Sequence, residues 1–88
     1  MNTRELIKKE LIGTPITVID STNENLIGTN GTIINETKNT LTLDNGKTII
    51  KNQTTLKITM DNETFIINGK NLIGTPEDRL KKVKHFEE

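Results

Sequence analysis

The densest group of chemically active side chains lies near the C-terminus, in the segment "PEDRLKKVKHFEE". Four positive charges fall within six residues there: Arg79, Lys81, Lys82 and Lys84. Clustered Lys and Arg side chains can neutralise RNA phosphates and release the bound counterions. The same run also fits a solvent-exposed helix, in which acidic residues 77 and 78 pair with the lysines four positions later. The charge pattern alone leaves both interpretations open.

Residues that could catalyse a reaction are scarce. Ser21 is the only serine, and the only histidine, His85, lies far from it in the sequence. There is no cysteine, which excludes a disulfide and a cysteine-ligated zinc site. The glycines in "GTNG" lack the lysine and helix that follow in a phosphate-binding loop. We therefore expect no active site in this chain, and no cofactor bound by it.

Composition indicates one small domain without a membrane span. The 88 residues carry twelve basic and twelve acidic side chains, so the net charge gives no general attraction for nucleic acid. A chain of this length buries a modest core. No apolar run approaches the roughly 20 residues of a spanning helix, and the lack of cysteine suits a reducing compartment. We expect a cytoplasmic protein with no membrane partner.

Short helices are predicted at both ends of the chain. Over residues 1–12, apolar side chains recur at helical spacing, and Gly13 and Pro15 end the pattern. A second helix is predicted over 76–84, where Thr75 is a good N-cap, the proline occupies the first helical position and Asp78 the capping-box position. Helices of this length are marginal alone in water, so both need a surface to pack on.

Residues 15–68 have the pattern of strands and hairpins. "TLTL" alternates Leu41 and Leu43 with threonine, and "TLKITM" and "ETFIIN" also place apolar residues on one face. "DNG" and "DN" supply turn residues that tolerate positive φ. In "ETKNT", Asn39 fits a turn for the same reason. Five to six short strands predict a mainly β fold, a small antiparallel barrel within a single domain of residues 1–88.

Aromatic stacking is not available as a way to bind RNA. The chain has two aromatic residues, and Phe65 alternates with the predicted core face. Single-strand RNA modules commonly stack bases on exposed aromatic side chains. Any contact with RNA should therefore use Lys and Arg on phosphates together with hydrogen bonds from Asn and Thr, which favours recognition of shape over sequence.

Two segments carry a resemblance to a known family. "NLIGTNGTIINETKNTL" matches a pattern of Leu-Ile/Val-Gly, a glycine three residues later, an apolar pair and Glu-Thr-x-Asn-Thr-Leu. "GKNLIGTPEDR" matches Gly-x-x-Leu-x-Gly-x-Pro-Glu-x-Arg. Over roughly residues 5 to 82 the chain resembles archaeal ribonuclease P protein component 1, a family of Sm-like barrel subunits. Thr75 stands where family members often carry arginine, and the chain is less basic than most of them.

The resemblance implies a protein subunit of the ribonuclease P ribonucleoprotein. Its RNA would be the catalyst and would use Mg²⁺, while the protein would bind that RNA and assist removal of the 5′ leader from precursor tRNA, which it would meet indirectly. A zinc-ribbon subunit would be its heterodimer partner. With that family in view, the expected RNA-binding residues are Lys38, Asn39, Thr40, Lys70, Arg79, Lys81 and Lys82. The expected partner interface is Leu6, Ile7, Leu11, Leu80 and Val83.

A free-standing Sm-like or SH3-like barrel that binds RNA or only protein is the alternative. A ring of identical Sm-like subunits would need an open edge strand to pair with its neighbour. A barrel that binds only protein should show no salt-dependent retention of RNA. These two observations separate the alternatives from a ribonuclease P subunit.

Overall fold

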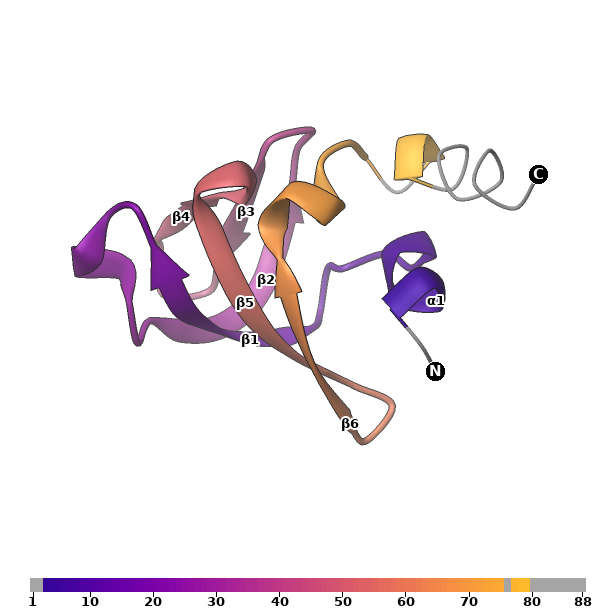
Figure 1. The fold of residues 1–88 in the computed structure, drawn as a ribbon, viewed down its shortest axis with the longest axis horizontal. Helices are drawn as coiled ribbons and strands as arrows, with labels where there is room; N and C mark the ends of the chain where they lie inside the picture. The colour runs from indigo at the N-terminus through magenta and orange to yellow at the C-terminus, as the bar shows by residue number, and fades with distance from the viewer. Residues whose placement is uncertain (1–2, 76, 80–88) are drawn as a thin grey trace.

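The structure is a computed structural model that describes residues 3–75 and 77–79 (Figure 1). The elements, with η for a 3-10 helix, are α1 (Thr3–Lys8), β1 (Pro15–Ser21), η1 (Glu24–Leu26), β2 (Asn30–Glu36), β3 (Thr40–Leu43), β4 (Thr48–Ile50), η2 (Lys51–Gln53), β5 (Thr54–Met60), β6 (Glu63–Asn68) and η3 (Gly69–Leu72). Residues 77–79 are also helical. No helix in the described ranges is long and apolar enough to cross a membrane. The predicted mainly β fold is confirmed.

The six strands form one antiparallel sheet in the order β4-β3-β2-β1-β5-β6. β2 belongs to both halves of this sheet, because its first residues pair with β1 and its last residues pair with β3. The register shifts between Ile33 and Asn35 in β2 and between Val18 and Asp20 in β1. Such bulges bend a strand and increase its twist, which curls the sheet toward a barrel.

The two edge strands, β4 and β6, approach each other through the 3-10 helices that follow them. η2 and η3 pack so closely that a Cβ on Gly69 would lie 1.8 Å from the Lys51 carbonyl oxygen. Only glycine fits at this position, because any side chain would have to displace backbone. This contact brings the two edges of the curled sheet together at one end. β4 and β6 themselves do not pair through backbone hydrogen bonds.

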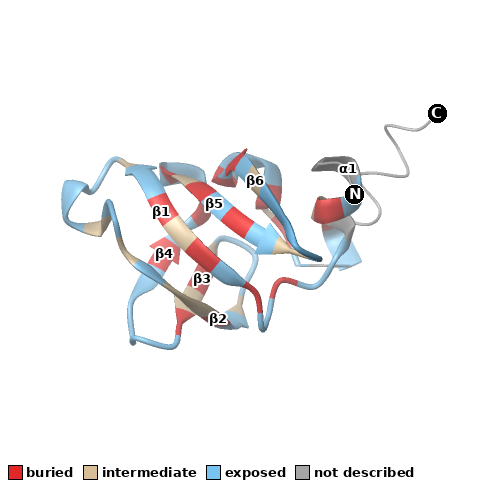
Figure 2. Ribbon diagram, turned by 90° about the horizontal axis from the view of Figure 1, so that it is seen from below, coloured by how far each residue is buried: buried red, intermediate tan, exposed pale blue. Residues whose placement is uncertain are grey.

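The core lies inside the curl, as the burial pattern of the strands shows (Figure 2). Among the described residues, twelve apolar side chains are buried in it: Leu6, Leu11, Ile16, Val18, Ile33, Leu41, Leu43, Ile49, Leu56, Ile58, Ile67 and Leu72. Met60 and Phe65 are partly buried against them. The inward faces predicted from alternation are thus confirmed for β3, β5 and β6.

The N-terminal helix is shorter than predicted, ending at Lys8 in place of residue 12. Leu6 and Leu11 are both fully buried. Five positions along a helix turn a side chain by about 140°, so a continuous helix would point one of them away from the barrel. The chain instead turns after Lys8, and Gly13, at φ 91°, donates its N–H to the Ile33 carbonyl at 2.7 Å.

Turn geometry agrees with prediction at two hairpins and differs at a third. Asp61 and Asn62 have φ of 53° and 64°, as a two-residue connection between β5 and β6 requires. In the "DNG" turn only Gly46 has positive φ, and Asn39 is not left-handed. The prediction for Asn39 was wrong because hydrogen bonds from elsewhere in the chain hold its turn.

Candidate nucleic-acid interface

Three ionised side chains are buried together where β2 ends. Glu36 accepts from Lys51 Nζ through Oε2 at 2.7 Å, and the same oxygen accepts from Arg79 Nη1. Arg79 Nη2 reaches Glu36 Oε1 at 3.3 Å. The Lys51 and Arg79 side chains have no exposed area, and that of Glu36 is 2% exposed. We refer to Glu36, Lys51 and Arg79 as the ion cluster.

The ammonium of Lys51 is buried and donates hydrogen bonds to several acceptors at the end of the barrel. Besides Glu36, Lys51 Nζ donates to the carbonyls of Thr37 at 2.8 Å, Lys38 at 3.3 Å and Gly74 at 3.0 Å. Burial lowers the pKa of Lys51, and the nearby Arg79 charge acts in the same direction, while the hydrogen bond and charge of Glu36 oppose the shift. The ammonium therefore ties the β2–β3 turn and the segment after η3 to η2, the element that carries Lys51.

Arg79 connects both ends of the chain to the barrel. Its Nε donates to the Ile7 carbonyl at 2.9 Å and its Nη2 to the Lys9 carbonyl at 3.1 Å, both at the end of α1. Nη1 donates to the carbonyls of Leu72 at 3.2 Å and Gly74 at 2.7 Å. The planar guanidinium suits this site because it presents five donors in fixed directions. α1 and residues 77–79 accordingly lie on the same side of the barrel (Figure 1).

The expectation that Arg79 contacts RNA does not hold for this structure. Arg79 is fully buried, so its guanidinium has no surface that could contact RNA. The reason lies in the helix start. Thr75 Oγ1 accepts the Asp78 N–H at 3.4 Å and Asp78 Oδ2 accepts the Thr75 N–H at 3.3 Å, as the capping-box pattern predicts. The Arg79 N–H bonds to the Thr75 carbonyl at 2.9 Å. This turn directs Arg79 inward. Lys81 and Lys82, predicted as its neighbours on RNA, lie outside the described residues.

The turn between β2 and β3 has a fixed backbone and exposed side chains. Gly74 N–H donates to the Lys38 carbonyl at 2.7 Å, and Lys51 N–H donates to the Asn39 carbonyl at 2.8 Å. The side chains of Lys38 and Asn39 face solvent. Thr40 differs, because its hydroxyl shares a 2.6 Å hydrogen bond with Thr37 Oγ1 and is partly buried. Lys38 and Asn39 remain candidates for RNA contact, and Thr40 serves the turn.

Lys70 lies on η3, at the same end of the barrel as this turn. Asn68 caps η3 by accepting the Lys70 N–H at 3.0 Å, and the Lys70 side chain is exposed. The Gly74–Lys38 bond joins the segment after η3 to the β2–β3 turn. The structure thus places two exposed cations, Lys38 and Lys70, on neighbouring segments held by the ion cluster. We refer to Lys38, Asn39 and Lys70 as the basic end.

Two of the predicted partner-interface residues face this chain's own core. Leu6 and Leu11 are fully buried, and Ile7 is partly buried against the core. The prediction was wrong for Leu6 and Leu11 because the docking surface that α1 needs is the barrel itself. Leu80 and Val83 lie outside the described residues. Ile12, next to Leu11, is 45% exposed.

Residues 4–82 match the sequence model of the family described as ribonuclease P/MRP, subunit p29. The chain belongs to that family. A solved structure titled "Structure of Mth11: A homologue of human RNase P protein Rpp29" is similar to it at 30% identity and a TM-score of 0.57. The alignment covers 81% of this chain and 97% of that one. A comparison with curated proteins found no match.

The two sequence patterns that carry the resemblance meet in the ion cluster. Glu36 belongs to the Glu-Thr-x-Asn-Thr-Leu pattern, and Gly69 and Arg79 begin and end the C-terminal one. The two patterns are distant in sequence, and the Glu36–Arg79 ion pair joins them. Sequence reasoning missed Lys51, which follows an apolar strand and has no motif of its own. Sequence reasoning also grouped Arg79 with the lysines of the basic run. The position of Arg79 at the end of the C-terminal pattern was a signal that it has a separate role.

Proposed function

We propose that this p29-family subunit binds the RNA of ribonuclease P through the basic end and thereby assists removal of the 5′ leader from precursor tRNA. The family match over residues 4–82 carries this proposal. The geometry supports it, because Lys38 and Lys70 are exposed on backbone that the ion cluster holds in place. A preformed surface loses less conformational freedom on binding RNA.

Several finer features belong to the same proposal. The RNA acts as the catalyst with Mg²⁺, and this chain contacts precursor tRNA only through the particle. The other protein in direct contact is a zinc-ribbon subunit, the source is archaeal, the barrel is Sm-like, and the particle works in the cytoplasm. The family resemblance of the two sequence patterns supports the RNA catalyst, the zinc-ribbon partner, the archaeal source and the Sm-like barrel, and the lack of cysteine suits a reducing compartment. The exposed side chain of Ile12 beside α1 suits a protein partner on that side.

Reconstitution tests the proposal. Ribonuclease P RNA, the zinc-ribbon subunit and precursor tRNA are combined with and without this chain, and release of the 5′ leader is measured. We expect faster cleavage, or cleavage at lower Mg²⁺, when the chain is present. An unchanged rate together with no retention of the RNA on the protein would contradict the proposal. Mass measurement of the isolated chain separates it from a homo-oligomeric ring, which would pair the edges β4 and β6.

A further inference from the structure

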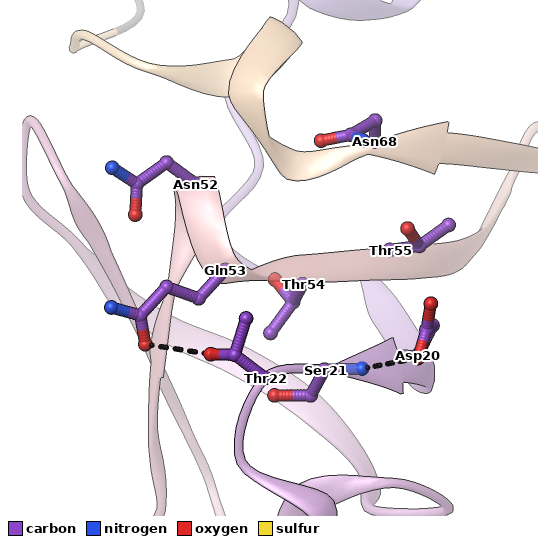
Figure 3. A pocket seen from close by; sticks show the side chains of 8 residues that line it. All are labelled: Asp20, Ser21, Thr22, Asn52, Gln53, Thr54, Thr55 and Asn68. Carbon is purple, nitrogen blue, oxygen red and sulfur yellow. Dashed lines mark hydrogen bonds between the residues drawn. The ribbon is translucent and has the colours of Figure 1, made fainter.

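Two depressions lie on the outer face of the sheet. Neither is lined by a residue of the basic end. The first, about 340 Å³, is lined by residues that include Asp20, Thr55 and Asn68 (Figure 3). The second, about 360 Å³, is lined by residues that include Lys57 and Thr59. Thr55, Lys57 and Thr59 alternate along β5, so their side chains leave the same face of the strand. One continuous surface therefore connects the two depressions.

The first depression has the chemistry to accept N–H groups. The strand register places Asp20 beside Thr55, and Thr55 beside Asn68. Asp20 is the only ionisable residue in the lining, and its carboxylate would repel a phosphate. Asp20 Oδ1 accepts the Ser21 N–H at 2.9 Å, which fixes the carboxylate and leaves Oδ2 to accept from a ligand.

The opposite wall of the first depression supplies donors. Thr22 Oγ1 donates to Gln53 Oε1 at 3.2 Å, so the Gln53 NH₂ group is directed elsewhere (Figure 3). The Asn52 side chain makes no hydrogen bond to any other described residue. Asn52 and Gln53 lie across the depression from Asp20, with their amide nitrogens directed away from it (Figure 3). Because amides donate and accept and the carboxylate accepts, the lining as a whole offers the mixed donors and acceptors that the edge of a nucleobase can pair with.

The second depression has the chemistry to bind a phosphate. Lys57 is the only ionisable residue in its lining and is exposed. Thr17 lies opposite Lys57 in the ladder, and the lining also includes Thr59 and Asn30. An ammonium, two hydroxyls and an amide are all hydrogen-bond donors, and such groups position nucleic-acid backbones.

We propose that the outer face of β1 and β5 binds an unpaired nucleotide of RNA, with its phosphate at Lys57 and an amino-bearing base at Asp20. This inference rests on the proposed function for the presence of RNA and adds a site and a base preference. Thr55 and Lys57 are two residues apart on β5, about 6.6 Å along the strand, so a single nucleotide spans both depressions. A protein partner would favour a more apolar lining than these two depressions have. An apolar side chain that could serve a protein partner is Ile66, which lies beside Lys57 and is 61% exposed.

The phosphate contact is tested by Lys57→Ala, with Lys47→Ala as the matched control on the β3–β4 turn, where Lys47 is also exposed. Binding to ribonuclease P RNA is measured from low to moderate salt. We expect Lys57→Ala to weaken binding several-fold and to lower the slope of log affinity against log salt by roughly 0.7, as for one single-strand phosphate. Equal slopes for Lys57→Ala, Lys47→Ala and the wild type would overturn the phosphate contact.

The base contact is tested by Asp20→Asn, which keeps the oxygen that accepts the Ser21 N–H. The probes are short homopolymers of adenylate, cytidylate and uridylate. The wild type should bind the adenylate and cytidylate probes about tenfold more tightly than uridylate, which lacks an amino group, and Asp20→Asn should lose this preference. Tighter binding of all three probes to Asp20→Asn would mean that the depression takes a phosphate, and would overturn the base assignment.

The outcomes separate this inference from the proposed function. If the wild type fails to retain ribonuclease P RNA, the proposed function fails first. If the wild type retains the RNA and both variants bind it equally well, only the outer-face site is overturned. If both variants bind RNA normally but weaken the complex with the zinc-ribbon subunit, the face binds protein and the RNA assignment is wrong. Thermal melting of the variants should match the wild type, because Asp20 and Lys57 are exposed.

Discussion

In the ion cluster two cations are buried around one carboxylate, whereas on the outer face of β5 the cation Lys57 is exposed. Among the described residues no buried side-chain nitrogen or oxygen lacks a hydrogen-bond partner, so Lys51 and Arg79 have nothing left to offer a phosphate. The chain thus uses some of its basic residues to hold its own backbone and leaves others exposed to solvent. Counting charges along the sequence does not distinguish these two uses.

Removing the shared carboxylate should have the largest effect. Glu36→Gln leaves two buried cations without their anion, and breaking a buried ion pair typically costs about 3–5 kcal/mol. We expect a loss of that size in the free energy of unfolding, measured with urea. Glu24→Gln is the control, because Glu24 is exposed and its change should stay within about 0.5 kcal/mol. Equal stability of the two variants would show that the cluster does not hold the fold.

Replacing the guanidinium should loosen one part of the molecule. Arg79→Lys keeps a positive charge but loses the planar set of donors that reaches Ile7, Lys9 and Glu36 together. We expect a cost of about 1.5–3 kcal/mol and faster hydrogen exchange in α1 than in β5. Lys57→Ala, which removes a cation from the outer face, should leave exchange in α1 unchanged. Unchanged exchange in Arg79→Lys would mean that the packing of Leu6 and Ile7 on the barrel holds the helix without the guanidinium.

The lowered pKa of Lys51 predicts a smaller, pH-dependent effect. Because the unfolded chain binds the Lys51 proton more tightly than the folded chain, the stability due to this group rises with pH between its lowered pKa and the ordinary value of 10.5. The free energy of unfolding of the wild type, relative to Lys51→Met, should increase through that alkaline window and be flat below it. A difference that falls with rising pH would contradict the assignment.

The smallest effect on stability is expected at the basic end. Lys38→Ala removes a side chain that faces solvent, while the Lys38 carbonyl still accepts from Gly74. The melting temperature should stay nearly unchanged, and the salt slope of binding to ribonuclease P RNA should fall by roughly 0.7–0.9. Unchanged RNA binding would make the turn purely structural. A lower melting temperature would show that the Lys38 side chain stabilises the fold, as the side chains of the ion cluster are expected to do.

The strands and their inward faces could be predicted because the information is local. Leu41 and Leu43, or Leu56 and Ile58, alternate with polar residues, and a period of two belongs to a half-buried strand. The Asp61–Asn62 turn is equally local, since those residues tolerate positive φ. The limits of α1 were missed because they depend on where the barrel accepts Leu11, which no local pattern records.

The ion cluster could not be predicted from charge patterns because its members meet only in the folded chain. Arg79 lies 43 positions after Glu36 and 72 after Ile7. In the sequence it stands among lysines, and such runs are usually exposed. The family patterns contained both Glu36 and Arg79 without showing that they touch. The polar lining of the outer face was missed for a similar reason, since Asp20, Thr55 and Asn68 become neighbours only through strand register.

The order in which the chain is made gives the Arg79 contacts a further consequence. During synthesis Glu36 and Lys51 leave the ribosome before Arg79, so the contacts of Arg79 with Glu36 and with α1 are the last in this group to become possible. Contacts between segments 72 positions apart carry a large loop-closure entropy and form late in folding. Interactions absent from the transition state mainly slow unfolding. We therefore expect Arg79 to prolong the lifetime of the folded state while leaving the folding rate nearly unchanged.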